Sequence, residues 1–402
     1  MKTQIITAQL DAAAELLRQG ELVAVPTETV YGLAGNGLDE KTVHAIYEVK
    51  GRPERKPLSL MVPDAEAMAV YCESVPEQAY FLAERFWPGP LTIVLKAKDI
   101  VPDIVRAGGE TVGLRCPDHP MTLELLRRAQ IPFAAPSANP SGEPSPKTAE
   151  EVKRYFDGQI AAIVDGGPCG LGQESTLLLM TTRPYRILRQ GALAEETIAA
   201  ALVEHMTLIG ITGGSGGGKT TALREIERQG GLILDCDAVY HELLAQRAEL
   251  LGELEEHFPG CVRNGRLERK ALGSIVFQDG EKLKTLNAIT HRYVIAEIEH
   301  RLRDWAMRGG TLAALDAIEL LSSGLGARCD LTVGILAERE TRVQRIMARD
   351  GISREYALAR IKAQRPDVYY IENCDRVLYN DGDEAAFTQA FQRLIKESQT
   401  HV

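Results

Sequence analysis

One glycine-rich segment in the second half of the chain has the residue types and spacing of a phosphate-binding loop. It fits the pattern Gly-x-x-x-x-Gly-Lys-Ser/Thr at every fixed position and consists of Gly213, Gly214, Ser215, Gly216, Gly217, Gly218, Lys219 and Thr220. Backbone N–H groups in such a loop turn toward an anion, and a following helix adds its positive end. We expect Lys219 to reach the β- and γ-phosphates of a nucleotide and the Thr220 hydroxyl to bind Mg²⁺.

The segments on either side of this loop give it the expected context. Residues 207–212 are apolar and β-branched, which predicts a buried strand, and residues 221–226 predict a helix. Thr221 opens this helix and is counted with the ATP-binding residues. The alternative is a flexible Gly/Ser linker, which the strand and the Lys-Thr pair disfavour. The second half is therefore expected to bind a nucleoside triphosphate.

Carboxylates follow two further predicted strands of this half. The run 231–237 ends in Asp235 and Asp237, and the run 311–315 is followed by Asp316. At the carboxyl ends of parallel strands these groups face a nucleotide crevice. Asp316 is placed where a carboxylate would hold Mg²⁺, and Asp237 is a candidate base for a substrate hydroxyl. The alternative for Asp237 is a plain helix N-cap.

A basic helix is predicted over residues 339–349. Arg342, Arg345 and Arg349 share one face by their 3–4 spacing. This face is able to close over ATP as a lid, and the alternative is an ordinary solvated surface helix.

The first half contains a different cationic feature. Lys50, Arg52, Arg55 and Lys56 lie within seven residues, among two prolines and a glycine. An irregular loop of this kind directs several cations at one polyanion, whereas a charge run alone is more often a solvated turn. Polar loops at 136–142 and 26–33 add hydroxyl and amide groups, and each is weak evidence by itself. Helical and strand patterns alternate around these loops, which predicts a mixed α/β fold.

Bulk properties limit the remaining possibilities. The 402 residues suggest two or three domains, and the net charge is −10. Residues 1–206 carry 20 Lys and Arg against 27 Asp and Glu, so bulk charge does not favour strong direct nucleic-acid binding. The seven cysteines are scattered without C-x-x-C spacing, which is typical of free thiols in a reducing compartment. Neither a signal peptide nor a membrane span is predicted, and the cytoplasm is the expected location.

The chain is predicted to divide into domains 1–205 and 206–402. Residues 192–205 form an expected terminal helix, and Met206 stands directly before the strand of the phosphate loop. A methionine at this place indicates the start of a formerly separate protein, now fused, and the alternative is an ordinary core methionine.

Six strings place the first half close to a known family. PTETVYGL, KGRPERKPLS, GLRCPDHP, PSANPSG, STLL and ILRQGAL occur in the order found in the YrdC-like threonylcarbamoyl-AMP synthases, which residues 5–200 resemble. The resemblance implies a twisted α/β sheet around a large cavity. It also implies condensation of L-threonine, bicarbonate and ATP into threonylcarbamoyl-adenylate for a tRNA modification. Partner proteins of that modification would receive the adenylate.

The same resemblance assigns roles to the first-half residues. Cations facing the phosphates would be Lys50, Arg52 and Lys56, aided by Ser137 and Asn139, and the first two would be catalytic. Arg115 and Arg189 would hold the adenylate or the substrate carboxylate. Candidates for threonine recognition are Thr29, Tyr31 and Ser175. No residue stands out as a general base.

The second half resembles dephospho-CoA kinase over residues 207–398. The strings that carry it include GITGGSGGGKTT, LDCDAVYHELL, CDLTVGILAERETRVQRIMARDGIS and DRVLYNDGD. The resemblance implies a parallel sheet with a helical lid and an acceptor region, and transfer of phosphate from ATP to the ribose 3′-hydroxyl of dephospho-CoA. Asp237 would be the base, Lys219 catalytic, Arg345 a lid cation, and Asn380 would lie near the adenine.

Two departures from the kinase pattern lie toward the acceptor. The family's Thr-His-Pro is replaced by Thr290-His291-Arg292, and its Pro-Leu-Leu-Phe-Glu by residues 318–322, Ile-Glu-Leu-Leu-Ser. A kinase of another nucleoside or nucleotide therefore stays open as an alternative. So does a different class of protein, an RNA-binding or regulatory first half controlled by a nucleotide switch.

Overall fold

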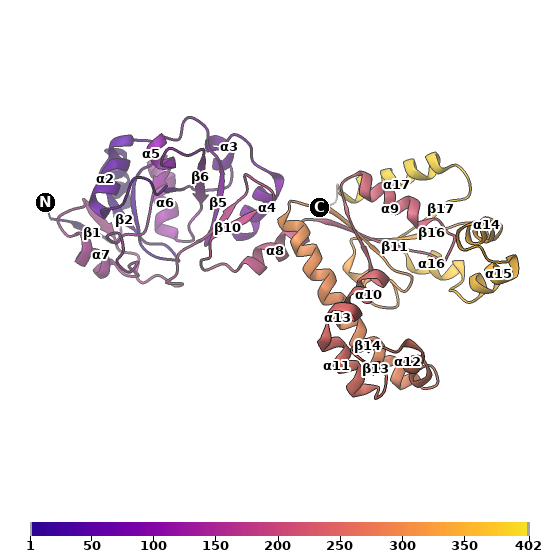
Figure 1. The fold of residues 1–402 in the computed structure, drawn as a ribbon. Coiled ribbons are helices and arrows are strands. Elements are labelled where there is room, and N and C mark those ends of the chain that lie inside the picture. The colour runs from indigo at the N-terminus through magenta and orange to yellow at the C-terminus, as the bar shows by residue number, and fades with distance from the viewer. Residues whose placement is uncertain (1, 400–402) are drawn as a thin grey trace. The chain divides into compact units, whose positions relative to one another are not determined.

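The computed structural model describes residues 2–399 and divides them into two compact units. One unit runs to Leu202 and includes Met307–Gly309, and the other comprises Val203–Ala306 and continues from Gly310. Figure 1 labels the elements of both units.

The first unit is built on a ten-stranded mixed sheet. Its strand order is β1-β8-β2-β3-β7-β4-β6-β5-β9-β10. The pairs β1/β8, β2/β8, β4/β6 and β5/β9 are parallel, and the other neighbours run antiparallel. The strands are β1 (Gln4–Ile6), β2 (Val23–Val25), β3 (Gly32–Asn36), β4 (Ser59–Met61), β5 (Leu91–Lys96), β6 (Thr111–Arg115), β7 (Phe133–Ala134), β8 (Ala162–Val164), β9 (Thr176–Leu179) and β10 (Arg186–Arg189).

Helices cover this sheet and bury its apolar residues. In one cluster, Ala13 and Leu17 of α1 and Leu125 of α6 pack against Val23 and Val25 of the sheet. Local signals fix the helix ends: the Asp39 carboxylate caps α2, and Gly51 closes it with φ 58°. The helices are α1 (Leu10–Arg18), α2 (Glu40–Lys50), α3 (Ala67–Tyr71), α4 (Glu77–Phe86), α5 (Asp103–Arg106), α6 (Pro120–Ala129), α7 (Ala149–Phe156) and α8 (Glu195–Glu204).

The second unit has a five-stranded, fully parallel sheet in the order β12-β15-β11-β16-β17. Side chains alternate between its faces, as the pleat requires. Leu312 and Ala314 belong to one apolar cluster, and Ala313 and Leu315 to another. The strands are β11 (Thr207–Thr212), β12 (Leu232–Asp235), β15 (Leu312–Asp316), β16 (Leu331–Leu336) and β17 (Arg376–Tyr379).

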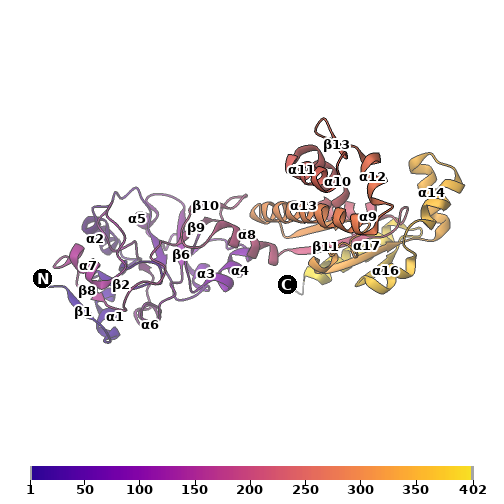
Figure 2. The same cartoon turned by 90° about the horizontal axis from the view of Figure 1, so that it is seen from below.

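Two groups of helices enclose this sheet. Ile226 of α9 and Phe387 and Phe391 of α17 fill the cluster on one face, and Figures 1 and 2 both draw α9 beside α17. Val239 of α10 and Ile298 of α13 belong to the cluster on the other face. The helices are α9 (Lys219–Arg228), α10 (Cys236–Gln246), α11 (Ala248–His257), α12 (Arg269–Val276), α13 (Gly280–Met307), α14 (Arg339–Asp350), α15 (Arg354–Lys362), α16 (Asp367–Asn373) and α17 (Glu384–Gln399), with the short hairpin β13 (Val262–Arg263) and β14 (Arg266–Leu267) and the 3-10 turn η1 (Gly326–Arg328).

The predicted fold class is confirmed in both units, and one predicted boundary is wrong. The strand expected over 231–237 is β12, which ends at Asp235, and α10 begins at Cys236 rather than Ala238. Asp237 therefore lies in the first turn of a helix, because the Asp235 carboxylate ends the strand by capping that helix. Across residues 2–399, none of the helices has both the length and the apolar character that crossing a membrane requires.

Candidate functional sites

A polar pocket lies among the strands and loops of the first unit. Its volume is about 140 Å³, roughly ten times the space that one water centre needs. Three arginines and one carboxylate carry its charge, Arg52, Arg115, Arg189 and Glu174, and Ser59, Thr92, Ser137 and Ser175 add hydroxyls. The pocket therefore offers several guanidinium groups to a single anionic ligand.

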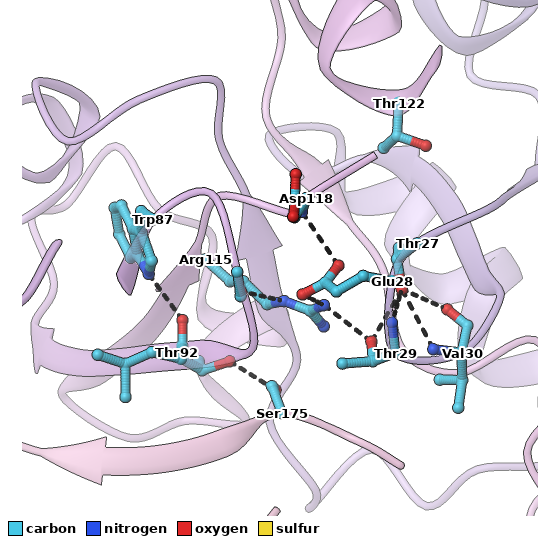
Figure 3. A network of polar contacts seen from close by, with 12 residues as sticks. Thr27, Glu28, Thr29, Val30, Trp87, Thr92, Arg115, Asp118, Thr122 and Ser175 are labelled. Atoms are coloured by element: carbon cyan, nitrogen blue, oxygen red, sulfur yellow. Dashed lines mark hydrogen bonds and ion pairs between the residues drawn. The ribbon is translucent and has the colours of Figure 1, made fainter. Parts of the chain in front are cut away.

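Arg115 is held in place by a buried polar network (Figure 3). Its guanidinium lies 2.7 Å from the Glu28 carboxylate and donates to the Thr29 hydroxyl at 2.8 Å. The Thr29 hydroxyl in turn lies 2.8 Å from that of Thr27, and both threonines are fully buried. Glu28 also accepts the backbone N–H of Asp118 at 3.0 Å. These contacts fix the guanidinium in one orientation before any ligand binds.

A second arginine and two hydroxyls line the pocket from β5 and the segments around β9 and β10. Arg189 donates to the Ser175 carbonyl at 2.9 Å and forms an ion pair with Glu174. Burial lowers the pKa of Arg189, and the charge of Glu174 opposes that decrease. The Ser175 and Thr92 hydroxyls are 2.8 Å apart (Figure 3).

Lys50 lies beneath a pocket loop rather than inside the pocket. It is the last residue of α2 and only 3% exposed. Its ammonium donates to the carbonyls of Ser137 and Asn139, the latter at 2.5 Å, and its own carbonyl accepts the Ser141 N–H at 2.7 Å. Burial lowers the pKa of Lys50 to about 7, and the Arg52 charge adds to the decrease. The side chain thus ties the 137–141 loop to α2.

The remaining predicted residues of the first unit divide between the pocket and its surroundings. Arg52 lines the pocket and donates to the Pro57 carbonyl at 3.0 Å, whereas Lys56 is exposed and outside the lining. Tyr31 is fully buried, and its hydroxyl donates to the Gly167 carbonyl at 2.8 Å. Asn139 is 6% exposed, and its Oδ1 is buried without a hydrogen-bond partner. Of the predicted residues, the pocket lining contains Arg52, Arg115, Ser137, Ser175 and Arg189.

The sequence reasoning missed the two carboxylates of this region. Glu28 lies between the two threonines of PTETVYGL, and Glu174 directly precedes Ser175. Glu28 lies inside the PTETVYGL string, and Glu174 lies immediately before the STLL string. The rule that a buried arginine needs a counter-charge would have identified a carboxylate partner for Arg115, which is 7% exposed. It does not apply to Arg189, whose side chain is exposed.

In the second unit the glycine-rich loop connects β11 to α9, as its pattern predicts. The backbone of Gly213 lies so close to β16 that a Cβ there would be 2.2 Å from the Ile335 carbonyl oxygen. Gly218 has φ 101° and is the N-cap of α9, a conformation that side chains with a Cβ rarely adopt. The loop therefore stands at the carboxyl end of the central strand, with a helix N-terminus behind it.

Lys219, Thr220 and Asp316 lie around this helix start. The Lys219 ammonium donates to the Gly213 carbonyl at 3.2 Å and is 3.8 Å from Asp316 Oδ1. This Oδ1 is buried and accepts no hydrogen bond, and burial raises the pKa of Asp316 while Lys219 lowers it. Thr220 is exposed in the first turn of α9. A carboxylate oxygen and a hydroxyl beside a phosphate cradle fit Mg²⁺, which takes few protein ligands and completes its shell with phosphates and water. Residues 2–399 contain no group of three or more His, Cys, Asp and Glu side chains placed to hold a metal by themselves.

Asp237 is available for chemistry because its neighbour provides the helix cap. The Asp235 carboxylate accepts the backbone N–H groups of Asp237 and Ala238 at 2.9 and 3.0 Å. The N-cap alternative considered for Asp237 is therefore wrong, and its own side chain is exposed. Asp235 is opposite Asp316 in the β12/β15 register, so the carboxylates gather at one edge of the sheet.

The three arginines of α14 have three different environments. Arg345 donates to the Gly216 carbonyl at 3.2 Å and to the Asn380 side chain at 3.3 Å, and Asn380 is 4% exposed. Arg342 is 5% exposed and bonded to the loop, as described below. Arg349 pairs with Asp350 at 2.8 Å. Two of the three predicted lid cations thus contact the phosphate loop or its neighbours directly.

The Thr290-His291-Arg292 departure has a visible structural consequence. α13 runs without interruption through this segment, where a proline would remove a backbone hydrogen bond. Arg292 donates to Glu253 of α11 at 2.6 Å and so ties two helices of the acceptor region together.

The fold and the sites define a chain with two α/β units, one with an arginine-lined pocket and one with a phosphate loop on a parallel sheet. Residues 15–191 match the Sua5/YciO/YrdC family model, described as telomere recombination. Residues 207–386 match the dephospho-CoA kinase model. The chain belongs to the threonylcarbamoyl-AMP synthase family and carries a dephospho-CoA kinase domain in its second half.

Two relatives found by sequence support the assignment of the first half. A threonylcarbamoyl-AMP synthase of Pyrococcus abyssi is 46% identical over 192 residues, which cover 48% of this chain and 56% of the relative. A putative threonylcarbamoyl-AMP synthase of Mycobacterium tuberculosis is 36% identical over 201 residues, covering 50% of this chain and 92% of the relative. The crystal structure of P. abyssi Sua5 complexed with L-threonine aligns with 27% identity and a TM-score of 0.49, over 83% of this chain and all of that one. The chain spans about half the length of several of its curated relatives.

Proposed function

We propose that the first unit condenses L-threonine, bicarbonate and ATP into threonylcarbamoyl-adenylate and pyrophosphate. The observation that carries this proposal is the convergence of three arginines from separate segments, Arg52, Arg115 and Arg189, on one pocket in a chain of this family. Arginine forks match phosphate and carboxylate groups, which are the charged groups of these substrates.

The chemistry needs charge stabilisation more than covalent help. Bicarbonate takes up a proton and loses water to supply CO₂, and the neutral threonine amine adds to CO₂ and releases a proton to give a carbamate. A carbamate oxygen then attacks the α-phosphorus of ATP. The new P–O bond replaces the bond to pyrophosphate, which leaves with its electron pair. Negative charge accumulates on the phosphate oxygens, so fixed guanidinium groups lower the barrier.

The pocket residues take complementary roles in this proposal. Arg52 faces the phosphates, and Arg115 and Arg189 orient the adenylate or the threonine carboxylate. The Ser175 hydroxyl contacts the threonine substrate. Lys50 supports the loop carrying Ser137 and Asn139, and Lys56 adds positive charge from the rim. Thr29 holds Arg115 through its hydroxyl, and Tyr31 is bonded to the Gly167 carbonyl.

Product analysis tests this activity directly. Full-length protein with threonine, bicarbonate and Mg-ATP is expected to release pyrophosphate and to form a species with the mass of threonylcarbamoyl-adenylate. Omitting either threonine or bicarbonate should stop pyrophosphate release. Release that continues without them would refute the proposal and leave a nucleotide-hydrolysing or regulatory unit.

For the second unit we propose transfer of the γ-phosphate of ATP to the ribose 3′-hydroxyl of dephospho-CoA. The loop amides and Lys219 hold the β- and γ-phosphates, and Arg345 approaches from the lid. Asp237 accepts the hydroxyl proton as the oxygen attacks phosphorus, and ADP leaves. Thr220 and Asp316 would hold Mg²⁺, which supplies charge neutralisation for the phosphates.

An acceptor comparison tests the kinase proposal. Dephospho-CoA, adenosine, AMP and a deoxynucleoside are each incubated with the protein and Mg-ATP, and ADP formation is followed. We expect dephospho-CoA to be strongly preferred. Equal or better use of another acceptor would assign the altered segments at 290–292 and 318–322 to a different specificity.

We also propose how these activities are placed in the cell. The labile adenylate is expected to pass to tRNA-modification proteins, because the first unit's excess of acidic residues does not favour a direct hold on tRNA. Both substrate sets are cytoplasmic metabolites, which makes the cytoplasm the proposed location.

A further inference from the structure

The phosphate loop of the second unit is bonded to a residue outside any phosphate-binding pattern, Gln364. This residue lies between α15 and α16. Its Oε1 accepts the backbone N–H of Ser215 at 2.9 Å, and its Nε2 donates to the Ser215 hydroxyl at 2.7 Å. One side-chain amide thus holds a loop residue at two points, 149 positions away in sequence.

Arg342 completes the contact from the neighbouring lid helix. Its Nε donates to the Ser215 carbonyl at 3.0 Å, and its Nη2 donates to Gln364 Oε1 at 3.1 Å. Its Nη1 lies 3.0 Å from the Asp367 carboxylate at the start of α16. The guanidinium is therefore buried with its charge compensated, and all three polar groups of Ser215 are bonded.

The fit between this cluster and the loop is close. A Cβ on Gly214 would be 2.3 Å from Arg342 Nη2 and 3.0 Å from Gln364 Oε1. A Cβ on Gly216 would be 2.8 Å from the Arg342 carbonyl oxygen. Two of the four variable positions, 214 and 216, are thus glycine because the lid packs directly against them.

In a phosphate cradle the amides are useful only if the loop holds its curvature. The Ser215 N–H points to Gln364 and not to a nucleotide, so Gln364 acts on the loop and not on the ligand. We propose that Gln364, supported by Arg342, is a positioning residue for ATP binding that couples the lid helices to the outer turn of the phosphate loop. This inference deepens the kinase proposal and rests on it.

Because Gln364 contacts the phosphate loop, its loss should change the binding of ATP and leave the phosphate-transfer step nearly unchanged. A loop that loses its support binds ATP more weakly in the ground state and in the transition state alike, so KM for ATP rises while kcat changes little. Gln364→Ala removes two hydrogen bonds, and we expect KM for ATP to increase about tenfold. KM for dephospho-CoA should stay within about twofold, since Gln364 acts only through the ATP loop.

Gln344→Ala is the matched control, because Gln344 is an exposed glutamine on α14, the helix that carries Arg342. Ser215→Ala removes only the hydroxyl contact and should raise KM for ATP about threefold. Added to Gln364→Ala it should have no further effect, since its partner is already gone. Thermal unfolding of each variant within a few degrees of the wild type verifies folding.

The experiment measures initial rates of the full-length variants against ATP concentration, together with binding of a fluorescent ATP analogue. The part of the analogue binding that Lys219→Ala removes is assigned to the second unit. This binding needs no acceptor, so its measurement tests the inference even if dephospho-CoA is not phosphorylated. No difference between wild type and Lys219→Ala would refute nucleotide binding by this unit itself. An unchanged nucleotide affinity in Gln364→Ala would overturn the positioning role. So would a double variant whose loss of ATP affinity equals the sum of the losses in Gln364→Ala and Ser215→Ala.

Discussion

At the scale of single residues, the pocket of the first unit depends on how the charges in and beneath it are balanced. Arg115 and Arg189 each have a carboxylate partner, whereas Lys50 has only carbonyl oxygens around its ammonium. The carbonyls favour the charged form and burial disfavours it. Burial dominates, which brings the pKa of Lys50 to about 7.

Lys50 is therefore expected to titrate near neutral pH. Its ammonium loses its proton as the pH rises from 6 to 8, whereas ordinary lysines titrate near pH 10.4. NMR of protein labelled at lysine Cε should contain one signal that shifts over this range and is missing in Lys50→Met. A lysine spectrum without any transition between pH 6 and 8 would contradict the assignment.

The same proton predicts how stability depends on pH. Between about pH 7 and 10.5 the unfolded chain keeps the Lys50 proton and the folded chain has released it. Since the unfolded state then binds more protons, this group makes the free energy of unfolding increase with pH across that window. Well below pH 7 both states carry the proton, and the group adds no pH dependence. The free energy of unfolding of the first unit is measured with urea at pH 6, 7.5 and 9. It should increase less with pH in Lys50→Met than in the wild type. An identical rise in both proteins would show that Lys50 is not the source.

Glu174 should tune the anion affinity of the pocket. Glu174→Gln removes one negative charge beside Arg189, which for groups roughly 6 Å apart in a partly solvated site corresponds to about 1 kcal/mol. Pyrophosphate binding to the full-length protein, measured by calorimetry in the Lys219→Ala background, is expected to tighten several-fold. The gain should shrink at high salt, and weaker binding would indicate that Glu174 orders Arg189 for the ligand.

At the scale of elements, the phosphate loop depends on glycines at defined positions. Gly218→Ala would place a Cβ 2.1 Å from Asn380 Nδ2 at φ 101°, a strain of about 1–3 kcal/mol. We expect second-unit nucleotide binding to fall at least tenfold while pyrophosphate release by the first unit is unchanged. Gly252→Ala on the exposed face of α11 has open space around its Cβ and serves as the control. Equal behaviour of the two variants would contradict the role assigned to Gly218.

The elements show which parts of the structure were predictable from the sequence. β11 matches its predicted range fully, since six apolar or β-branched residues before a glycine loop permit little else. The end of β12 was predicted wrongly because either Asp235 or Asp237 suits a helix cap, and only the fold decides between them. The contacts of Lys50 with Ser137 and of Gln364 with Ser215 join segments 87 and 149 residues apart. Local patterns contain no information on such pairs.

At the scale of the whole molecule, the chain joins two units that each have their own sheet and their own proposed anion site. The family of the first and the kinase domain of the second share ATP as a proposed substrate and nothing else. Each activity should therefore survive loss of the other. Arg52→Ala is expected to reduce pyrophosphate release at least a hundredfold with CoA formation intact, and Lys219→Ala to do the reverse. Joint loss in either variant would show that the units are coupled.

The central claim is that one chain performs two ATP-dependent reactions, and one assay of full-length protein tests it most directly. ATP consumption is measured with threonine plus bicarbonate, with dephospho-CoA, and with neither. The account predicts pyrophosphate in the first case, ADP with CoA in the second, and little consumption in the third. Consumption that ignores the added substrates, or that responds to only one set, would contradict it.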